Sequence, residues 1–409
     1  MSITQIPLFS KENDRILLQK NLLKNSLHQN IPLARLLHVN KMSYDDLIYT
    51  HHEYKNFEKK KNLVLSDFQE KENNIPVISF FSGAGGLDLG FEAAGFQHSM
   101  LFEKIPLFCE TLRFNRPFWS VFDADVSKTD EMVEIIKNQI GSSYFDGVFI
   151  GGPPCQPFSI ASNQRFAKTD QNFKRIGFDH EQNGNLLFDY VELIKIFHPK
   201  VFIIENVSGL IDIDDGKQLS NVYKDLQKHG YTIHKPQIIN AEYFYVPQQR
   251  VRLFIIGYLG NKRFIPPRQT STPLACGNVF ELSLEEQHNH ITREHSAESI
   301  LRYMELKYGE RDKKGRVDRL DPSKPSKTII AGGTKGGGRS HLHPYIPRTL
   351  SVRESARLQT FPDSYIFTGS VARQFTQVGN AVPPILAAQL AKAIKPVSYT
   401  HLTLPTTPY

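Results

Sequence analysis

The sequence predicts an α/β fold in which a mostly parallel sheet carries helices on both faces, followed by a smaller and less regular domain. From Ile75 to Tyr258, short apolar runs with the length of buried strands alternate with helical patterns. Such alternation is typical of parallel sheets. From 259 to about 347 the alternation stops, and the chain becomes rich in proline, glycine and basic residues before a helical pattern resumes at Ser351.

The predicted elements follow from the two hydrophobic periods. Strands are expected over Val77–Phe81, Ser99–Phe102, Phe145–Ile150, Val201–Ile204 and Leu253–Gly257. Helices are expected over Ile16–Leu23, Leu33–Val39, Leu87–Ala94, Asp130–Gln139, Leu186–Phe197, Val352–Gln359 and Ile385–Ile394. Ligands of such sheets bind beyond the carboxyl ends of the strands, so motifs at those ends are the first candidates for a site.

The domain organisation is predicted in five segments. Residues 1–74 form an extension of unknown role, 75–258 a catalytic and cofactor-binding domain, and 259–347 a second domain. Residues 348–395 return to the first domain, and 396–409 match neither period and resemble translated cloning sequence, so we expect that tail to be non-native.

Bulk composition narrows the class of protein. The 409 residues are 40% hydrophobic and 22% charged, as in a globular protein, and they contain no long apolar run that would predict a membrane span. Three cysteines, Cys109, Cys155 and Cys276, argue against a disulfide framework and for a reducing, cytoplasmic setting, and none belongs to a cluster with zinc spacing, so we expect no metal.

Positive charge is concentrated in one stretch. The whole chain has a net charge of +7, and Lys262 to Arg348 contains 16 Lys and Arg against 10 Asp and Glu, a net +6. The same stretch contains the glycine-rich run Gly332–Arg339, which is either a solvated loop or a loop that follows a phosphate backbone.

A glycine motif, Phe81–Leu87, directly follows the first predicted strand. Glycines allow a tight turn and a close approach to a ligand, although a lone Gly-x-Gly is often only a turn. Glu103 ends the next strand about 20 residues later, the usual spacing for an acid that holds ribose hydroxyls. With Asp125 at the end of a third strand as an adenine acceptor, the pattern predicts a nucleoside cofactor, either a dinucleotide or S-adenosylmethionine.

The second motif, Gly151 to Ser159, presents Cys155 after a predicted strand. The two glycines and two prolines before Cys155 predict a rigid, exposed turn, whereas Cys109 lies in an apolar run as a buried structural cysteine does. Cys155 is therefore the candidate nucleophile, and its thiol needs local positive potential to react readily.

Two further motifs end or begin strands. Glu205 follows a strand and is either a surface acid or, beside a nucleophile, a group that grips a ring nitrogen. Arg250 and Arg252 enter another strand and are expected to project to the same face. Two arginines on one face are costly to bury unless acids or phosphates pair with them, so they indicate a site.

Together these motifs resemble those of the bacterial DNA (cytosine-5)-methyltransferase family. The resemblance runs from about Ile75 to Lys395 and covers six motifs in the family's order. They are Phe81–Gly86, Pro154–Gln156, Glu205–Val207, Gln248 with Arg250 and Arg252, Arg353–Pro362, and Gly379–Pro383.

The resemblance implies a Rossmann-like, S-adenosylmethionine-dependent methyltransferase with 259–347 as its target-recognition domain. Cys155 would attack carbon 6 of a flipped cytosine in double-stranded DNA, Glu205 would hold the ring nitrogen and amine, Arg252 would hold the base oxygen and orient Glu205, and Arg250 would support the adduct. The cofactor would contact Phe81, Ser82, Gly83, Ala84, Gly85, Gly86, Leu87, Glu103, Lys104, Asp125, Val126, Pro153, Asn380 and Ala381. DNA would contact Pro154, Gln156, Ser159 and Gln248, and Gln156 to about Asp170 would be a loop that closes over the base.

The same resemblance implies a cytoplasmic monomer, with a cognate restriction endonuclease as a possible partner on the same site. Three alternatives stay open at this point. A tRNA cytosine methyltransferase would share the chemistry, a DNA-binding regulator would have lost it, and a dinucleotide oxidoreductase would not need Pro-Pro-Cys-Gln.

Overall fold

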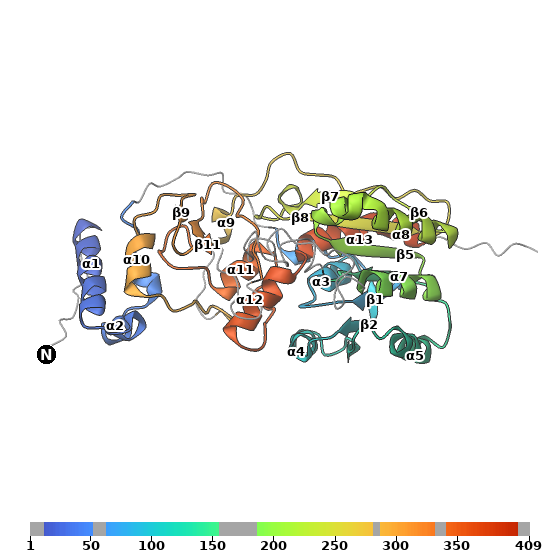
Figure 1. Ribbon diagram of the computed structural model, residues 1–409, viewed down its shortest axis with the longest axis horizontal. Coiled ribbons are helices and arrows are strands. Elements are labelled where there is room, and N and C mark those ends of the chain that lie inside the picture. The colour runs from blue at the N-terminus through green and yellow to red at the C-terminus, as the bar shows by residue number, and fades with distance from the viewer. Residues whose placement is uncertain (1–11, 52–62, 155–185, 281–286, 332–340, 400–409) are drawn as a thin grey trace, which may run out of the picture. The chain divides into compact units, whose positions relative to one another are not determined.

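A computed structural model describes residues 12–51, 63–154, 186–280, 287–331 and 341–399 (Figure 1). The chain divides into two compact units. The first unit comprises Met1–Asn62, Val246–Gln249 and Thr272–Asn380, and the second comprises Leu63–Tyr245, Arg250–Ser271 and Ala381–Tyr409. Within the described ranges, no helix is long and apolar enough to cross a membrane.

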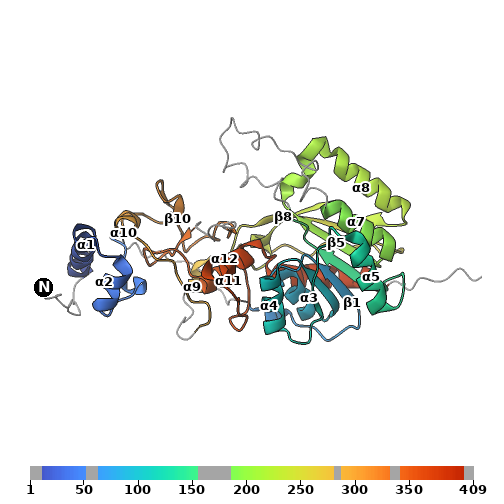
Figure 2. The same ribbon diagram turned by 60° about the horizontal axis from the view of Figure 1, so that its bottom comes forward.

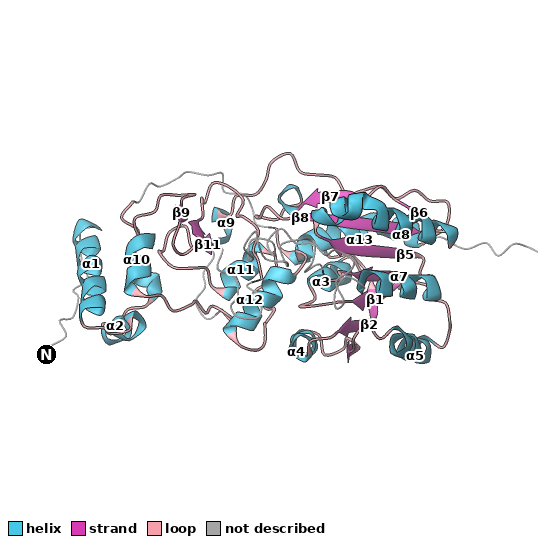
Figure 3. Ribbon diagram, in the orientation of Figure 1, coloured by secondary structure: helices cyan, strands magenta, loops and turns pink. Residues whose placement is uncertain are grey.

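The second unit is built on a sheet that has eight strands among the described residues (Figure 3). Their order is β3-β2-β1-β4-β5-β8-β6, and β7 also pairs with β8. The strands from β3 to β5 are parallel, whereas β8 runs antiparallel to β5, β6 and β7. The strands are β1 (Pro76–Phe80), β2 (Gln97–Glu103), β3 (Val121–Asp123), β4 (Val148–Gly151), β5 (Val201–Asn206), β6 (Thr232–Ile233), β7 (Gln237–Asn240) and β8 (Val251–Tyr258).

Helices cover both faces of this sheet (Figure 2). On one face, apolar side chains of the central strands form a core with α5, α7 and α8; on the other, α3 packs along α13, which also contacts β5. The helices of this unit are α3 (Gly86–Ala93), α4 (Pro106–Asn115), α5 (Thr129–Ile140), α7 (Leu186–Phe197), α8 (Lys217–Lys228) and α13 (Pro384–Ser398), with the 3-10 turns η2 (Leu65–Phe68), η6 (Ser208–Gly216) and η7 (Ala241–Tyr243).

The first unit combines short helices with a small sheet whose strand order is β11-β10-β9. Its core joins apolar side chains of α1, α2 and α10. The elements are α1 (Glu12–His28), α2 (Leu33–Val39), η1 (Tyr44–Asp46), α9 (Gly277–Phe280), α10 (Ala297–Tyr303), β9 (Arg311–Asp312), β10 (Val317–Arg319), β11 (His341–Leu342), α11 (Val352–Leu358) and α12 (Val371–Asn380).

The prediction of a mostly parallel sheet between two helical layers is confirmed, and the predicted strands overlap β1, β2, β4, β5 and β8. The boundaries of the two units differ from those of the five predicted segments, and the five segments stay a prediction. Residues 1–62 and the part of 348–395 that precedes Ala381 belong to the first unit. The last helix also continues through Pro396 to Ser398, so it includes the first three residues of the predicted tail.

Candidate active site

The glycine motif forms a tight loop between β1 and α3. Phe81, Gly83 and Gly85 all have positive φ, at 56°, 56° and 73°. Glycine adopts this conformation freely, but a phenylalanine does so only where its surroundings hold it there. The Phe81 ring packs edge-on against Tyr190, and the Ser82 amide donates to the Phe102 carbonyl at 3.2 Å. Neighbouring residues therefore hold the shape of the loop.

Close packing fixes the start of α3 against the segment that precedes α13. A Cβ on Gly86 would lie 2.3 Å from the Val382 carbonyl oxygen and 3.0 Å from the Ala381 Cβ, so only glycine fits. One turn later, a Cβ on Gly90 would lie 2.3 Å from the Ala387 Cβ. Ala381, a predicted cofactor residue, thus lies directly beside the glycine loop.

Glu103 lies at the end of β2 and faces the glycine loop. Its carboxylate accepts hydrogen bonds from the backbone amides of Gly83 at 2.8 Å and Ile105 at 2.9 Å. Burial raises the pKa of Glu103 despite these amides, and the nearby charge of Asp88 adds to the rise. Each carboxylate oxygen keeps a lone pair, so the group can still accept from ligand hydroxyls.

Asp125 follows β3 and is tied to its neighbours. Lys104 lies 2.6 Å from one carboxylate oxygen, and the Ser127 amide and hydroxyl donate to the other. Burial opposes ionisation, but these hydrogen bonds outweigh it and lower the pKa of Asp125. Val126 beside it is buried. An ionised acceptor and an apolar side chain at this strand end suit the edge and face of a nucleobase.

The turn that leads toward Cys155 is fixed against β5. A Cβ on Gly152 would lie only 2.9 Å from Oε2 of Glu205, so the backbone of this turn approaches the Glu205 carboxylate closely. The buried Asn206 side chain donates to the Pro153 carbonyl at 3.3 Å, and Pro154 is exposed. Glycine at 152 and asparagine at 206 therefore set the position of the turn.

Glu205 is paired with the arginine of β8. Arg252 Nε lies 3.0 Å from Glu205 Oε1, and the two side chains are only 18% and 12% exposed. Burial raises the pKa of Glu205, even though the charges of Arg252 and then Arg250 lower it. Arg250 is fully buried and precedes β8, and it acts on the same carboxylate. This acid is thus inclined to hold a proton while it lies beside two cations.

Gln248 has a different environment from the one expected for a DNA contact. It is fully buried, its amide nitrogen donates to Gln359 and to the Leu358 carbonyl, and its oxygen accepts from the Ile329 amide at 2.9 Å. This burial and these hydrogen bonds favour a positioning role for Gln248 within the first unit, and its contact with DNA stays a prediction. Asn380, in contrast, is exposed at the end of α12.

Several predicted features lie outside the described residues. They are Cys155, Gln156, Ser159, the loop from Gln156 to about Asp170, and the run Gly332–Arg339. The other two cysteines are described. Cys109 and Cys276 are both fully buried, and burial raises the pKa of each thiol well above its usual range, so neither is a ready nucleophile.

Sequence reasoning missed a buried acid–histidine pair on α3 and β2, the two elements that flank the glycine loop. Asp88, in the first turn of α3, lies 3.2 Å from Nε2 of His98 in β2, and both side chains are inaccessible to solvent. His98 also packs on Trp119 with ring centres 4.8 Å apart. An acid within the apolar stretch after the glycines was the signal that could have found this pair.

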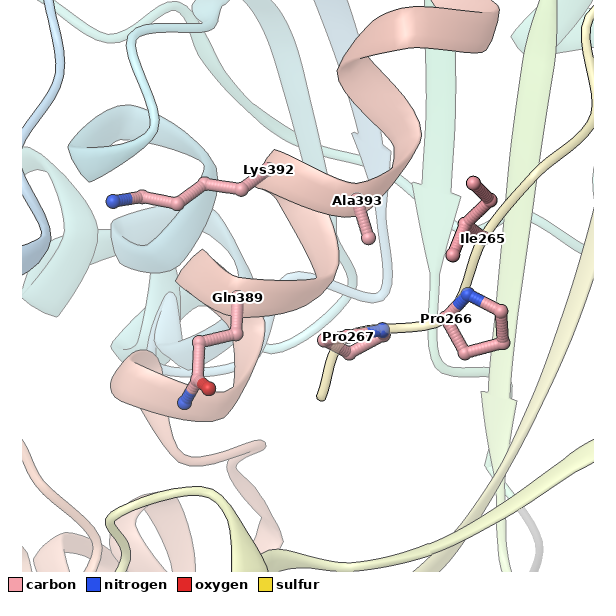
Figure 4. A pocket seen from close by; sticks show the side chains of 6 residues that line it. All are labelled: Ile265, Pro266, Pro267, Gln389, Lys392 and Ala393. Atoms are coloured by element: carbon pink, nitrogen blue, oxygen red, sulfur yellow. The ribbon is translucent and has the colours of Figure 1, made fainter. Parts of the chain in front are cut away.

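A pocket elsewhere in the second unit contains none of the predicted site residues. It has a volume of about 330 Å³ and lies between the segment Ile265–Pro267 and α13 (Figure 4). Gln389 in its wall donates to the Phe244 carbonyl, and Lys392 pairs with Glu70. Its lining contains neither a cysteine nor an acidic residue, so it lacks the groups that the predicted methyl transfer requires.

The fold and these strand ends define an α/β protein with a glycine loop after its first strand and a largely buried acid–arginine pair. Residues 75–396 match the family described as C-5 cytosine-specific DNA methylase. The chain is 33% identical to the Type II methyltransferase M.PspPI of Psychrobacter sp. over 80% of each chain. It is 31% identical to M.Eco47II of Escherichia coli, covering 85% of this chain and 86% of that one.

A solved structure agrees with this assignment. The crystal structure described as a putative DNA modification methyltransferase encoded within an E. coli prophage superposes with a TM-score of 0.62 at 26% identity, covering 79% of this chain and 99% of that one. The chain belongs to the C-5 cytosine-specific DNA methylase family. It is a DNA cytosine-5-methyltransferase that uses S-adenosylmethionine, and the predicted Rossmann-like methyltransferase fold is confirmed.

Proposed function

We propose that Cys155 is the nucleophile of this enzyme and that Glu205 and Arg252 activate the cytosine that it attacks. One observation carries the proposal. The buried Glu205 carboxylate is paired with Arg252 at 3.0 Å and abuts Gly152, three residues before Cys155. An acid inclined to hold a proton therefore lies beside the turn that precedes Cys155 in the chain.

The proposed steps follow from these groups. The Cys155 thiolate forms a bond to carbon 6 of a cytosine turned out of double-stranded DNA, and the displaced electron pair moves toward the ring nitrogen, where protonated Glu205 donates. Arg252 holds the base oxygen and orients Glu205, and Arg250 stabilises the adduct. Carbon 5 then takes the methyl group, a base removes its proton, and the sulfur–carbon bond breaks to release Cys155.

The glycine loop fits a nucleoside cofactor. Glu103 is anchored by two backbone amides and keeps acceptor capacity for ribose hydroxyls, and Asp125 keeps an ionised acceptor for an adenine amine. Bound S-adenosylmethionine supplies an electrophilic methyl group. We propose that it is held by Glu103, Asp125, Val126, Ala381 and the glycine loop, with Lys104, Pro153 and Asn380 as further contacts.

Target recognition is assigned to residues 259–347, whose excess of positive charge suits a phosphate backbone. Pro154 is exposed at the end of the described turn, as a DNA contact requires. Gln156 and Ser159 are proposed to contact DNA from the loop that closes over the base. The proposed setting is a restriction-modification system in the cytoplasm, in which a monomer protects the site that a companion endonuclease cuts.

Incubation with tritiated S-adenosylmethionine and either duplex DNA or tRNA tests the substrate. We expect label only in DNA, at cytosines that bisulfite sequencing locates in one short sequence. The Cys155→Ala variant should transfer no methyl group, whereas Cys276→Ala, which removes a thiol outside the motif, should retain activity. Label confined to tRNA, or methylation by Cys155→Ala, would overturn the proposal.

A further inference from the structure

Residues 12–51, which we call the N-terminal brace, precede the region that matches the family, since that match begins at residue 75. They nevertheless share a core with the first unit. Apolar side chains of α1, α2 and the following turn pack with side chains of α10, β10 and β11. This core comprises Leu22, Leu23, Leu33, Leu36, Leu37 and Leu47 from the brace, and Ala297, Ile300, Tyr303, Met304, Val317 and Leu342.

Specific polar contacts accompany this core. The Thr50 amide and hydroxyl both donate to the Met304 carbonyl at 2.8 Å. The buried Gln19 side chain donates to Ile48 and accepts from it, which fixes the turn after α2 against α1. Buried groups satisfied in this way specify one arrangement rather than a loose association.

Tyr49 connects the brace to the middle of the predicted recognition region. It is fully buried, and its hydroxyl donates to the His343 carbonyl at 2.8 Å. Its ring centre lies 3.5 Å from the guanidinium carbon of Arg319, which lies 4.0 Å from the ring centre of Tyr308 on its other side. Cation–π contacts with two aromatic rings offset part of the hydration that the buried guanidinium has lost.

Arg319 extends this connection along the backbone. It donates to the carbonyls of His51 at 3.3 Å, Leu306 at 2.6 Å and Pro344 at 2.9 Å. One side chain from β10 thus ties the end of the brace to the turn after α10 and to the segment after β11. Both of those turns lie within 259–347.

Asp45 makes the second connection, to the start of α11. It pairs with Arg348, which is 1% exposed and also binds Glu354 through two hydrogen bonds of 2.8 and 2.9 Å. Asp45 also lies 3.3 Å from Nε2 of His290, whose other ring nitrogen contacts the hydroxyl of Ser351, the cap of α11. The brace therefore contacts the segment 343–351 at two points, His343 and Arg348.

We infer that the N-terminal brace is a positioning element for target recognition, with Asp45 and Tyr49 as its positioning residues. The inference rests on the proposed function, in which 259–347 reads DNA. These two side chains hold the segment 343–351 and the turns around Arg319 in one arrangement. Small displacements of the groups that recognise DNA weaken its binding strongly. Loss of the Asp45 or Tyr49 contacts should therefore raise KM for DNA more than KM for the cofactor.

The test compares kinetics on a duplex oligonucleotide that bears the sequence mapped by bisulfite sequencing. In Asp45→Asn and in Tyr49→Phe, we expect KM for DNA to rise about tenfold and discrimination against a one-base-pair mismatch to fall, while KM for S-adenosylmethionine stays within about twofold. Asp45→Glu should restore the DNA values, because a longer carboxylate can still reach Arg348. Asp14→Asn, at an exposed acid of the same segment, is the matched control and should not differ from the parent chain.

Each outcome decides a different claim. An unchanged KM for DNA and unchanged discrimination in both folded variants, or an equal rise in both KM values, would overturn the brace as a positioning element. Tyr49→Phe keeps the ring against Arg319 and removes only the hydrogen bond to His343. The test can therefore be made with this variant if Asp45→Asn does not fold. Failure of the parent chain to methylate any DNA counts against the proposed function instead.

Discussion

Among the described residues, each unit contains a glutamate–arginine pair with little exposed surface, and the two pairs differ. In the first unit, Glu354 receives two hydrogen bonds from Arg348 and a third from the Ser351 amide. Burial opposes ionisation, but the charge and hydrogen bonds of Arg348 outweigh it and lower the pKa of Glu354 to about 2. In the second unit, burial dominates at Glu205 and raises its pKa in spite of Arg252.

The difference lies in how completely each carboxylate is satisfied. Glu354 is held by a two-pronged contact and a helix cap, so its charge is fixed and its contribution is structural. Glu205 Oε1 lies 3.0 Å from Arg252 Nε, its other oxygen faces Gly152, and the charge of Arg250 also acts on the carboxylate. An acid whose partners outweigh the cost of burial stays ionised, whereas an acid whose pKa is raised by burial can exchange a proton with a ligand.

The largest expected effect is on catalysis at the second pair. Glu205→Gln keeps the size and polarity of the side chain but cannot donate a carboxyl proton, so we expect kcat to fall roughly 10³-fold. Single-turnover methylation of the mapped duplex measures this. The free energy of unfolding should not decrease, because the neutral amide removes a buried acid. A retained kcat would show that Glu205 is no more catalytic than Glu354.

Substitution in the Glu354–Arg348 pair should reduce the stability of the fold. Glu354→Gln leaves Arg348 buried without its full partner, and we expect a loss of about 3 kcal/mol in the free energy of unfolding. Urea unfolding followed by circular dichroism measures this. Under conditions where the variant is folded, kcat at saturating DNA should stay within about threefold of the parent value. A large loss of kcat without destabilisation would contradict the structural role.

A smaller effect is expected at the turn beside Glu205. In Gly152→Ala the added Cβ would lie 2.9 Å from Glu205 Oε2, so either the turn or the carboxylate must shift. We expect kcat to fall roughly 10- to 100-fold, with KM for S-adenosylmethionine unchanged. A variant with the parent kcat would mean that the turn and Glu205 need not be so close during the reaction.

The smallest effects are those of pH on the two pairs. Because the folded pKa of Glu354 is below the unfolded value of about 4.3, its stabilisation is complete above that value and is lost as pH falls toward 2. The folded pKa of Glu205 is raised, so the proton it donates is lost as pH rises through that pKa. In Glu354→Gln, the loss of stability between about pH 4.3 and about pH 2 that Glu354 causes should disappear from acid unfolding. In Glu205→Gln, the fall in kcat at alkaline pH that Glu205 causes should disappear.

Much of the fold could be predicted because local patterns specify it. Leu186–Phe197 is helical over the predicted range, since its apolar residues recur at helical spacing. The antiparallel direction of β8 and the short strands β6 and β7 were not predicted, because pairing between distant strands leaves no local signal. For the same reason, the helical patterns in the N-terminal extension did not reveal that the segment packs against α10.

The candidate site was predictable in its residue types and not in its geometry. Motifs at strand ends identified Glu205, Arg252 and Glu103, and the structure shows which atoms of these groups meet. Gln248 had no local feature that marked it as buried, because its partners Ile329 and Gln359 lie far along the chain. Burial and the balance of charges decide the protonation of an acid, and both need tertiary structure.

The most direct test of the central claim is covalent trapping on duplex DNA that bears 5-fluorocytosine at the mapped position. With S-adenosylmethionine present, the parent chain and Glu354→Gln should form a stable protein–DNA adduct that peptide mapping locates to Cys155. Glu205→Gln should form it at least about 100-fold more slowly, and Cys155→Ala should form none. An adduct at another residue, or equal trapping rates in Glu205→Gln and Glu354→Gln, would contradict the account.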